Sequence, residues 1–387
     1  MRLIRRGQTG PDVDEVRAAL RTLGLIAEST ASGAYAGSTA TGGFDDVCDL
    51  AVRAFQQQRG ITVDGIVGPE TYRALTEARW HLGDRVLFYS VARPIVGDDV
   101  TTLQARLLEL GYDPGRADGV FGSQSKRALG QFQRDFGLPA DGTCGPATMR
   151  ALRQLGRHVI GGRPQLLRES AELVTSGPHL LGKHVVVDPG HGGGDPGNVT
   201  DGLRECDLAW DLANRLQGRL AAAGVTADLT RSRHAGPSDQ ERAQFANRVG
   251  ADLLVSLHVD AAPSGAAEGA ATYHFGTGHG LTSTVGDELA SLVQREVVAR
   301  TSLADGRTHA KTWDLLRLTR MPAIRLEAGY LSHQRDRAAL ADPAFRDRVA
   351  EAILVAVQRL YLPADLDPPT GTYQVAAART AAASAPR

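Results

Sequence analysis

Several features are scarce in this 387-residue sequence, and each shortage excludes a class of protein. The three cysteines, Cys48, Cys144 and Cys206, lie far apart, so we expect neither a disulfide framework nor a cysteine-based metal knuckle. No run of about eighteen apolar residues is present, so we expect no membrane insertion. The 43 Lys and Arg residues are balanced by 44 Asp and Glu residues. This balance argues against a protein that binds nucleic acid through its charge.

The N-terminus lacks the apolar run that a signal peptide requires. The basic start MRLIRR is followed at once by Gly, Gln, Thr, Gly, Pro and Asp. We therefore expect a cytoplasmic protein; the alternative is a cell-wall or extracellular protein exported by a route that the sequence does not reveal. The length predicts two or three domains, and 42% hydrophobic residues are enough to give each domain a core.

What the sequence does contain is an internal repeat. Residues 55–75 align with residues 132–152 at an offset of 77, and residues 10–25 align with residues 97–112 at an offset of 87. The first copy is longer because of a Ser-, Thr-, Gly- and Ala-rich stretch at 29–43, which we expect to be an exposed loop. Each copy combines apolar residues at helical spacing with a DG turn and a Gly-Pro helix start.

The two copies resemble the peptidoglycan-binding-like module, a small domain of three helices. The resemblance rests on FQ, DG and GP elements that occur in the same order in both copies. It implies all-α modules at 1–79 and 97–156, with linkers at 80–96 and 157–180, and it implies binding of glycan. The residues alone leave open an alternative, in which both copies are helical packing units without a ligand.

From residue 181 the pattern changes to alternating strands and helices. This alternation predicts an α/β domain at 181–362, with a mostly parallel sheet covered by helices on both faces. From Pro363 the chain lacks a packing face, so we expect a disordered tail at 363–387. The expected strands are 184–190, 225–231, 251–260, 270–276 and 322–331, and the expected helices are 205–224, 238–250, 284–300 and 343–362.

Two histidines lie where strands of this predicted sheet end. His191 follows the strand at 184–190, and His258 is near the end of the strand at 251–260. Ligands of open α/β sheets bind beyond the carboxyl ends of the strands. With acidic residues after other strands, the two histidines indicate a zinc site that keeps one position for water. The plainer interpretations are a His191 that closes a Gly-rich, phosphate-binding turn and a His258 without a ligand role.

Four segments resemble the zinc-dependent N-acetylmuramoyl-L-alanine amidases of type 3: DPGHGGGDPG (188–197), LREC (203–206), SLHVDAAP (256–263) and PAIRLEAGYLS (322–332). The resemblance covers about 182–362. It implies that His191, Glu205 and His258 bind zinc and that Glu327 is the catalytic acid and base. The bond cleaved would join the lactyl group of muramic acid to L-Ala of the stem peptide. The plainer interpretation of Glu205 is a carboxylate stabilised by a helix dipole.

Two positions depart from the amidase pattern. Arg325 stands where the family usually has an apolar residue, and strand periodicity places it on the same face as Glu327. We expect Arg325 to pair with Glu327, lower its pKa and withhold it from water; the alternative is that Arg325 binds a substrate carboxylate. Asp260 replaces a usual Asn. Four histidines match no ligand position and are expected on the surface or in loops: His274, His279, His309 and His333.

The layout of two modules before an amidase-type domain also resembles actinobacterial proteins of the CwlM type. That resemblance implies an alternative function, a non-hydrolytic cytoplasmic regulator of peptidoglycan precursor synthesis that keeps the amidase fold. Its partners would be a peptidoglycan-biosynthesis enzyme or a phosphothreonine-binding protein, with Thr370, Thr372 and Thr380 as the candidate phosphorylation sites. An active amidase would instead act on wall peptidoglycan, or on muropeptides during recycling.

Overall fold

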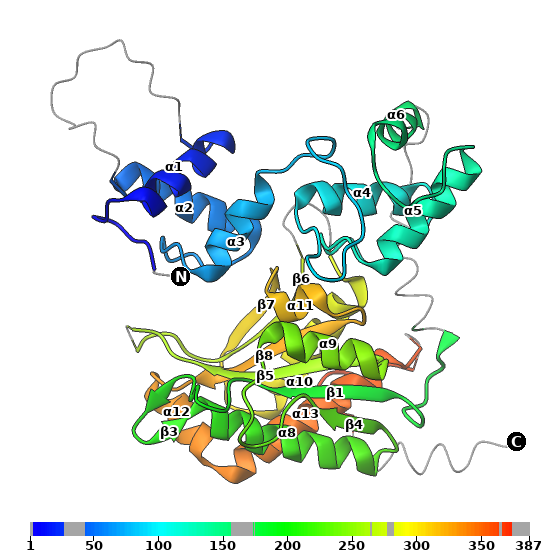
Figure 1. Ribbon diagram of the computed structural model, residues 1–387. Helices are drawn as coiled ribbons and strands as arrows, with labels where there is room; N and C mark the ends of the chain where they lie inside the picture. Colours follow the sequence, from blue (N-terminus) through cyan, green and yellow to red (C-terminus); the bar gives the residue numbers. More distant parts are fainter. Residues whose placement is uncertain are drawn as a thin grey trace, which may run out of the picture. The chain divides into compact units, whose positions relative to one another are not determined.

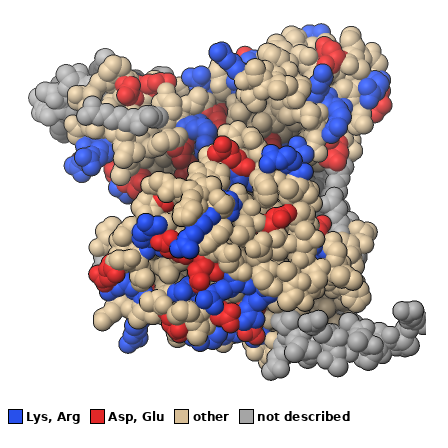
Figure 2. Space-filling model, turned by 60° about the horizontal axis from the view of Figure 1, so that its bottom comes forward, with Lys and Arg blue, Asp and Glu red and all other residues tan. Residues whose placement is uncertain are grey.

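The computed structural model describes residues 3–26, 43–155, 173, 175–263, 265–276, 282–363 and 366–373. The chain divides into two compact units, one of residues 1–165 with 277–281 and one of residues 166–276 with 282–387 (Figure 1). Within the described segments, no helix has both the length and the apolar composition needed to cross a bilayer. On the face drawn in Figure 2, basic and acidic side chains are interspersed, as the balanced composition predicts.

The first module contains the three predicted helices, α1 (Pro11–Thr22), α2 (Asp46–Arg59) and α3 (Pro69–Ala78). Helices α1 and α3 start with the proline that follows a glycine, and proline suits the first turn because that turn needs no N–H donor. Helix α2 is capped by the preceding residue, Asp45, whose carboxylate accepts a hydrogen bond from the backbone N–H of Cys48. The predicted loop at 29–43 lies almost entirely outside the described residues.

The second module repeats this arrangement with α4 (Asp98–Glu109), α5 (Ser123–Asp135) and α6 (Pro146–Leu155). Its core contains Phe121 and Phe132, both fully buried. The predicted linker at 80–96 is wrong in its extent, because Leu87 is fully buried in this same core and its backbone pairs with Cys144. Leu82 and Ile95 of the same segment also pack against this core, but its apolar residues do not follow a helical spacing, so the sequence did not indicate these contacts. Of the predicted linker at 157–180, the structure describes only residues 173 and 175–180.

A glutamine holds each Asp-Gly turn of the modules in place. The Gln104 side-chain amide donates to Asp118 at 2.8 Å and accepts from the Gly119 N–H at 2.9 Å. Gln133 makes the same two contacts with Asp141 and Gly142, and in the first module Gln56 makes them with Asp64 and Gly65. The three glycines have φ between 69° and 77°, which only glycine adopts readily. These contacts explain why the DG element recurs.

The second unit is built on a six-stranded sheet in the order β4-β1-β5-β8-β6-β7. All neighbouring pairs are parallel except β6 with β8, so the predicted mostly parallel sheet is confirmed. The strands are β1 (His184–Pro189), β4 (Thr226–Leu229), β5 (Leu253–Asp260), β6 (Ala270–Phe275), β7 (Asp305–Lys311) and β8 (Ala323–Tyr330).

Helices cover both faces of this sheet, as predicted (Figure 1). One face packs on α8 (Glu205–Ala222), α10 (Thr284–Arg300) and α13 (Pro343–Leu360) through a large aliphatic core. The other face packs on α9 (Asp239–Val249) and α11 (Asp314–Leu318). The sequence did not predict five elements of this unit: strands β2 (Val199–Thr200) and β3 (Leu203–Arg204), which form a hairpin, strand β7, and helices α11 and α12 (Gln334–Ala341).

The predicted disordered tail is wrong for residues 366–373, which contact α10 and α13. Arg359 is buried and forms ion pairs with Glu296 of α10 at 2.5 Å and with Asp367 of the tail at 2.7 Å. Its guanidinium also donates to the Thr370 hydroxyl, and the Gly371 N–H donates to Glu296. Charges and backbone groups make these contacts, so the segment shows no apolar periodicity. Residues 374–387 lie outside the described part of the chain.

Candidate active site and metal centre

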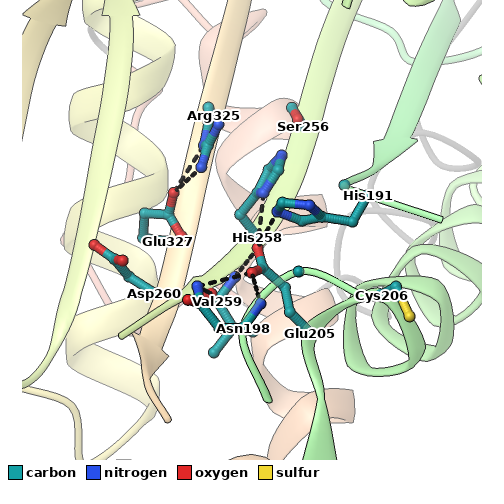
Figure 3. Close-up of polar contacts among 12 residues, drawn as sticks. His191, Asn198, Glu205, Cys206, Ser256, His258, Val259, Asp260, Arg325 and Glu327 are labelled. Atoms are coloured by element: carbon teal, nitrogen blue, oxygen red, sulfur yellow. Dashed lines mark hydrogen bonds and ion pairs between the residues drawn. The ribbon is translucent and has the colours of Figure 1, made fainter. Parts of the chain in front are cut away.

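Four elements meet at the carboxyl ends of the central parallel strands. His191 follows β1, Glu205 is the first residue of α8, and His258 and Glu327 are direct neighbours on β5 and β8 (Figure 3). These are the four site residues predicted from the sequence. Parallel strands that all end at one edge explain why residues so far apart in the sequence lie together.

The three predicted metal ligands form one compact group. Their ligand atoms all lie within 4.8 Å of one another. One oxygen of Glu205, Oε1, lies 3.1 Å from His191 Nε2 and 2.8 Å from His258 Nδ1. Two imidazole nitrogens and one carboxylate oxygen are a donor set that zinc accepts. Metal binding by these three residues stays a prediction, and their geometry is suitable for it.

A carboxylate outside the group orients His191. Asp195 Oδ2 lies 2.6 Å from His191 Nδ1, which turns the opposite ring nitrogen, Nε2, toward Glu205. Such a contact commonly fixes the ring orientation of metal-binding histidines. The turn is tight as well: His191 itself has φ of 55°, and a Cβ at Gly190 would overlap the His258 imidazole. Gly190 therefore leaves the space in which the second histidine lies.

Glu205 is almost fully buried, and backbone and amide groups hold it. Its second oxygen, Oε2, accepts hydrogen bonds from the backbone N–H and the side-chain amide of Asn198, at 3.0 Å and 2.9 Å. Burial alone would raise the pKa of Glu205, but the hydrogen bonds to His191 and His258 lower this pKa far below its ordinary value. Glu205 is therefore ionised in the neutral pH range, as a ligand carboxylate must be.

The two histidines respond differently to this environment. Burial, with the nearby Arg325 charge adding to it, lowers the pKa of His258 to about 4, so this ring is neutral and able to bind metal at pH 7. Burial also opposes protonation of His191, but the contacts with Glu205 and Asp195 outweigh it and raise the pKa of His191. Together the donor types and the ionised Glu205 fit a zinc ion.

Two buried arginines hold the backbone that carries His191. Arg231 donates to the carbonyl oxygens of Pro189 and Gly190, at 2.8 Å and 2.9 Å. Arg242 donates to the carbonyl oxygens of Pro189 and His191, at 2.8 Å and 2.7 Å. Both side chains are about 95% buried. Neither touches the ligand atoms, and both fix the turn from which His191 projects.

Asp188 balances the charge of Arg242 beneath this turn. Its carboxylate lies 2.7 Å from the Arg242 guanidinium and accepts hydrogen bonds from the hydroxyls of Ser256 and Thr230. Burial alone would raise the pKa of Asp188, but the Arg242 charge and the two hydroxyls lower it. The pair is therefore a buried, charged support of the site.

Glu327 lies opposite the metal-ligand group, on β8 (Figure 3). The Arg325 guanidinium contacts one of its oxygens, Oε1, through Nε at 2.7 Å and through Nη2 at 2.6 Å. The other oxygen, Oε2, is buried and has no hydrogen-bond partner among the described residues. The predicted ion pair is thus present. The predicted fall of the pKa is wrong: burial outweighs the Arg325 charge and raises the pKa of Glu327 to about 7.

The remaining sequence predictions lie outside this group or at its edge. Asp260 follows His258 by two residues, and its carboxylate accepts from the Ala261 N–H at 2.7 Å. The prediction of a surface or loop position is wrong for His274, which is buried within β6. His279 lies outside the described residues. His333 joins a second group of possible metal ligands, with Glu268 and Asp336.

Sequence reasoning missed the residues that support the site. Asp195 and Asn198 follow His191 closely, and a search for carboxylates and amides within the same loop would have found them. Arg231 and Arg242 lie outside the four amidase-like segments, so the sequence indicated no role for them. Trp313, whose ring lies against the Arg325 guanidinium, has no signal in the sequence, because β7 and α11 were not predicted.

Comparison with known proteins places this site in a family. Residues 185–359 match the N-acetylmuramoyl-L-alanine amidase family, and residues 9–75 and 96–152 match the peptidoglycan binding domain. The chain is 50% identical over 377 residues to N-acetylmuramoyl-L-alanine amidase CwlM of Mycobacterium tuberculosis, which covers 96% of this chain and 93% of the relative. The chain belongs to the N-acetylmuramoyl-L-alanine amidase family.

Two further similarities each cover about half of this chain. The chain is 28% identical over 195 residues to N-acetylmuramoyl-L-alanine amidase LytC of Bacillus subtilis, covering 50% of this chain and 38% of the relative. Among solved structures, an N-acetylmuramoyl-L-alanine amidase from Clostridium difficile 630 is 30% identical, with a TM-score of 0.43. That alignment covers 45% of this chain and 94% of the other. The amidase family match, at 185–359, lies in the second unit, and the two peptidoglycan binding domain matches lie in the two modules.

Proposed function

We propose that this protein is a zinc-dependent N-acetylmuramoyl-L-alanine amidase. It hydrolyses the amide between the lactyl group of muramic acid and L-Ala, in peptidoglycan or in muropeptides. The observation that carries the proposal is the convergence of His191, Glu205 and His258 opposite the buried carboxylate of Glu327. Metal-assisted amide hydrolysis requires a set of metal ligands, here imidazole nitrogens and a carboxylate oxygen, and one group that transfers protons.

In this proposal His191 Nε2, His258 Nδ1 and Glu205 Oε1 hold the zinc ion. Bound there, zinc would supply a Lewis acid that polarises the substrate carbonyl and favours ionisation of water near neutral pH. Glu327 performs the proton transfer. Its carboxylate can take a proton from water and return it to the departing amine. The partner-free oxygen Oε2 is the atom at which the proton is held.

The two N-terminal modules support a peptidoglycan substrate. Both match the peptidoglycan binding domain, and both contain the complete three-helix arrangement with its Gln-held DG turn. We propose that they bind glycan strands and hold the substrate near the amidase unit. Their binding of isolated glycan, measured with the intact chain, is the test of this part.

The test of the activity is incubation of the full-length, zinc-loaded chain with a defined muropeptide, followed by mass analysis. We expect release of the free stem peptide. We also expect the release to stop after treatment with a chelator and to return when zinc is added back. A zinc-loaded chain that leaves the muropeptide intact would contradict the proposal.

The alternative is a non-hydrolytic regulator of peptidoglycan precursor synthesis that keeps the amidase fold. The departure of this chain from the amidase pattern at Arg325, which forms an ion pair with Glu327, is the observation that raises it. Thr372 in the tail is exposed, and Thr370 contacts Arg359. Under this alternative the chain binds a biosynthetic enzyme or a phosphothreonine-binding protein, and the muropeptide stays intact although zinc is bound.

A further inference from the structure

We propose that Arg325 is a positioning residue that holds the Glu327 carboxylate in one orientation through one of its two oxygens. This inference rests on the proposed amidase function and concerns a residue outside the metal-ligand group. Two interpretations were open from the sequence, one in which Arg325 blocks Glu327 and one in which it binds a substrate carboxylate. The contacts of the guanidinium favour neither.

The ion pair between Arg325 and Glu327 involves only one of the two carboxylate oxygens. Arg325 places two nitrogens, Nε and Nη2, on the same oxygen of Glu327, Oε1. A guanidinium that masks a carboxylate usually binds both oxygens in a fork, with two parallel hydrogen bonds. Here the second oxygen, Oε2, is buried and has no partner in the described part of the chain. The pair therefore fixes the carboxylate by one oxygen and leaves the other without a partner there.

Aromatic rings hold Arg325 itself in place. Its guanidinium carbon lies 4.6 Å from the centre of the Trp313 ring, within the range of a cation–π contact. The Trp313 ring also packs against Tyr273, with 4.7 Å between ring centres, and Tyr273 is the neighbour of Arg325 across β6 and β8. A guanidinium held between an indole ring and a carboxylate is a fixed support rather than a gate.

Removing the Arg325 guanidinium would leave Glu327 without a partner. Glu327 is about 98% buried, and among the described residues Arg325 is its only hydrogen-bonding or ion-pair partner. Without the guanidinium, the carboxylate would be buried and unpaired, an arrangement that is unfavourable in proteins. It would turn or draw in water to find a new partner. Both changes remove the orientation needed for proton transfer.

The kinetic test compares three variants of the full-length, zinc-loaded chain. Arg325→Leu should lower kcat by about 100-fold, the size of effect that small misplacements in an active site produce, with KM little changed. Arg325→Lys, which keeps the charge with a less suitable geometry, should recover part of kcat. Arg320→Leu, an exposed arginine just before the same strand, is the matched control and should behave like the parent.

Two outcomes would overturn the proposal. A faster Arg325→Leu variant would show that Arg325 blocks the site. A higher KM with unchanged kcat would show that it binds substrate. Trp313→Leu tests the support from the other side, because it should lower kcat in the parent and have little further effect once Arg325 has been replaced.

A second measurement does not depend on hydrolysis. Arg325→Leu should lower the melting temperature of the metal-free chain, and this loss should shrink when Glu327→Leu is also present, because no buried charge is then left unpaired. Equal losses in both backgrounds would contradict the proposed pairing. If the parent leaves the muropeptide intact, the proposed function fails by itself, and this cycle still decides whether Arg325 holds Glu327.

Discussion

The two sides of the site are built in different ways. On the ligand side, two of the predicted metal ligands have supports outside the ligand group: Asp195 and the two arginines Arg231 and Arg242 for His191, and Asn198 for Glu205. On the β8 side Glu327 has one support, Arg325, through one oxygen. The difference indicates that the geometry of metal binding is secured many times over, whereas proton transfer depends on a single side chain.

The largest effect is expected when one of the predicted metal ligands is replaced. His191→Ala or His258→Ala leaves two of the three predicted ligands. Either change should weaken zinc binding by more than the ~100-fold expected for loss of a supporting residue, so that almost no zinc stays bound. His309→Ala, an exposed histidine on β7, is the control and should keep the metal. Metal analysis after dialysis measures the result. Full zinc content in either ligand variant would show that the site lies elsewhere.

The next largest effect is expected for Glu327, whose replacement should change the rate of hydrolysis but not the zinc content. Glu327→Ala should keep its zinc, because Glu327 is not among the ligand atoms, but should lose about 100- to 10,000-fold in rate, as removal of an acid–base group does. Metal content and stem-peptide release, measured on the same sample, check both parts. Hydrolysis at the parent rate would assign the proton transfer to another group.

A smaller effect on the ligand side is expected from Arg242, which supports His191 without touching the metal. Arg242→Gln should weaken zinc binding by about 10- to 100-fold, the range typical of supporting residues. Arg359→Gln is the control: Arg359 is as deeply buried and also ion-paired, but it contacts α10 and the tail instead of the site. Both variants should lose stability. If both also lost zinc affinity equally, the effect would be general rather than local.

The smallest effect is a pH dependence of stability beneath the same turn. The pKa of Asp188 is lower in the folded chain than its ordinary value, so Asp188 stabilises the fold above about pH 4, and this contribution is lost as the pH falls below that value. Asp188→Asn should therefore destabilise the metal-free chain at pH 7 by about 1–3 kcal/mol and show a weaker decline toward pH 3. Urea unfolding at several pH values provides the measurement. Parallel pH curves for the two chains would assign the decline to other carboxylates.

The ligand side could be predicted from the sequence because its residues stand in short motifs at strand ends. The same was true of the sheet and of the module helices, whose apolar residues follow a regular period. Strand β7 escaped prediction because its sequence, DGRTHAK, is polar and largely exposed. The contacts of Asp367 and Gly371 escaped because ion pairs and backbone groups leave no periodic pattern.

The error on Glu327 has a different origin. The sequence correctly placed Arg325 beside it, but the direction of its pKa shift depends on how completely the carboxylate is buried. That burial comes from β5, β6 and β8 packing around one position, which no local pattern reveals. His274 illustrates the same point, since it is a polar residue buried within a central strand.

The most direct test of the central claim is hydrolysis of a defined muropeptide in water labelled with oxygen-18, followed by mass analysis of both products. We predict one heavy oxygen in the new carboxyl group of the lactyl-bearing sugar and none in the stem peptide, which leaves with a free amine on L-Ala. Zinc-dependent formation of these two products would establish the amidase reaction. An intact muropeptide in the presence of the zinc-loaded chain, or label in a different bond, would contradict it.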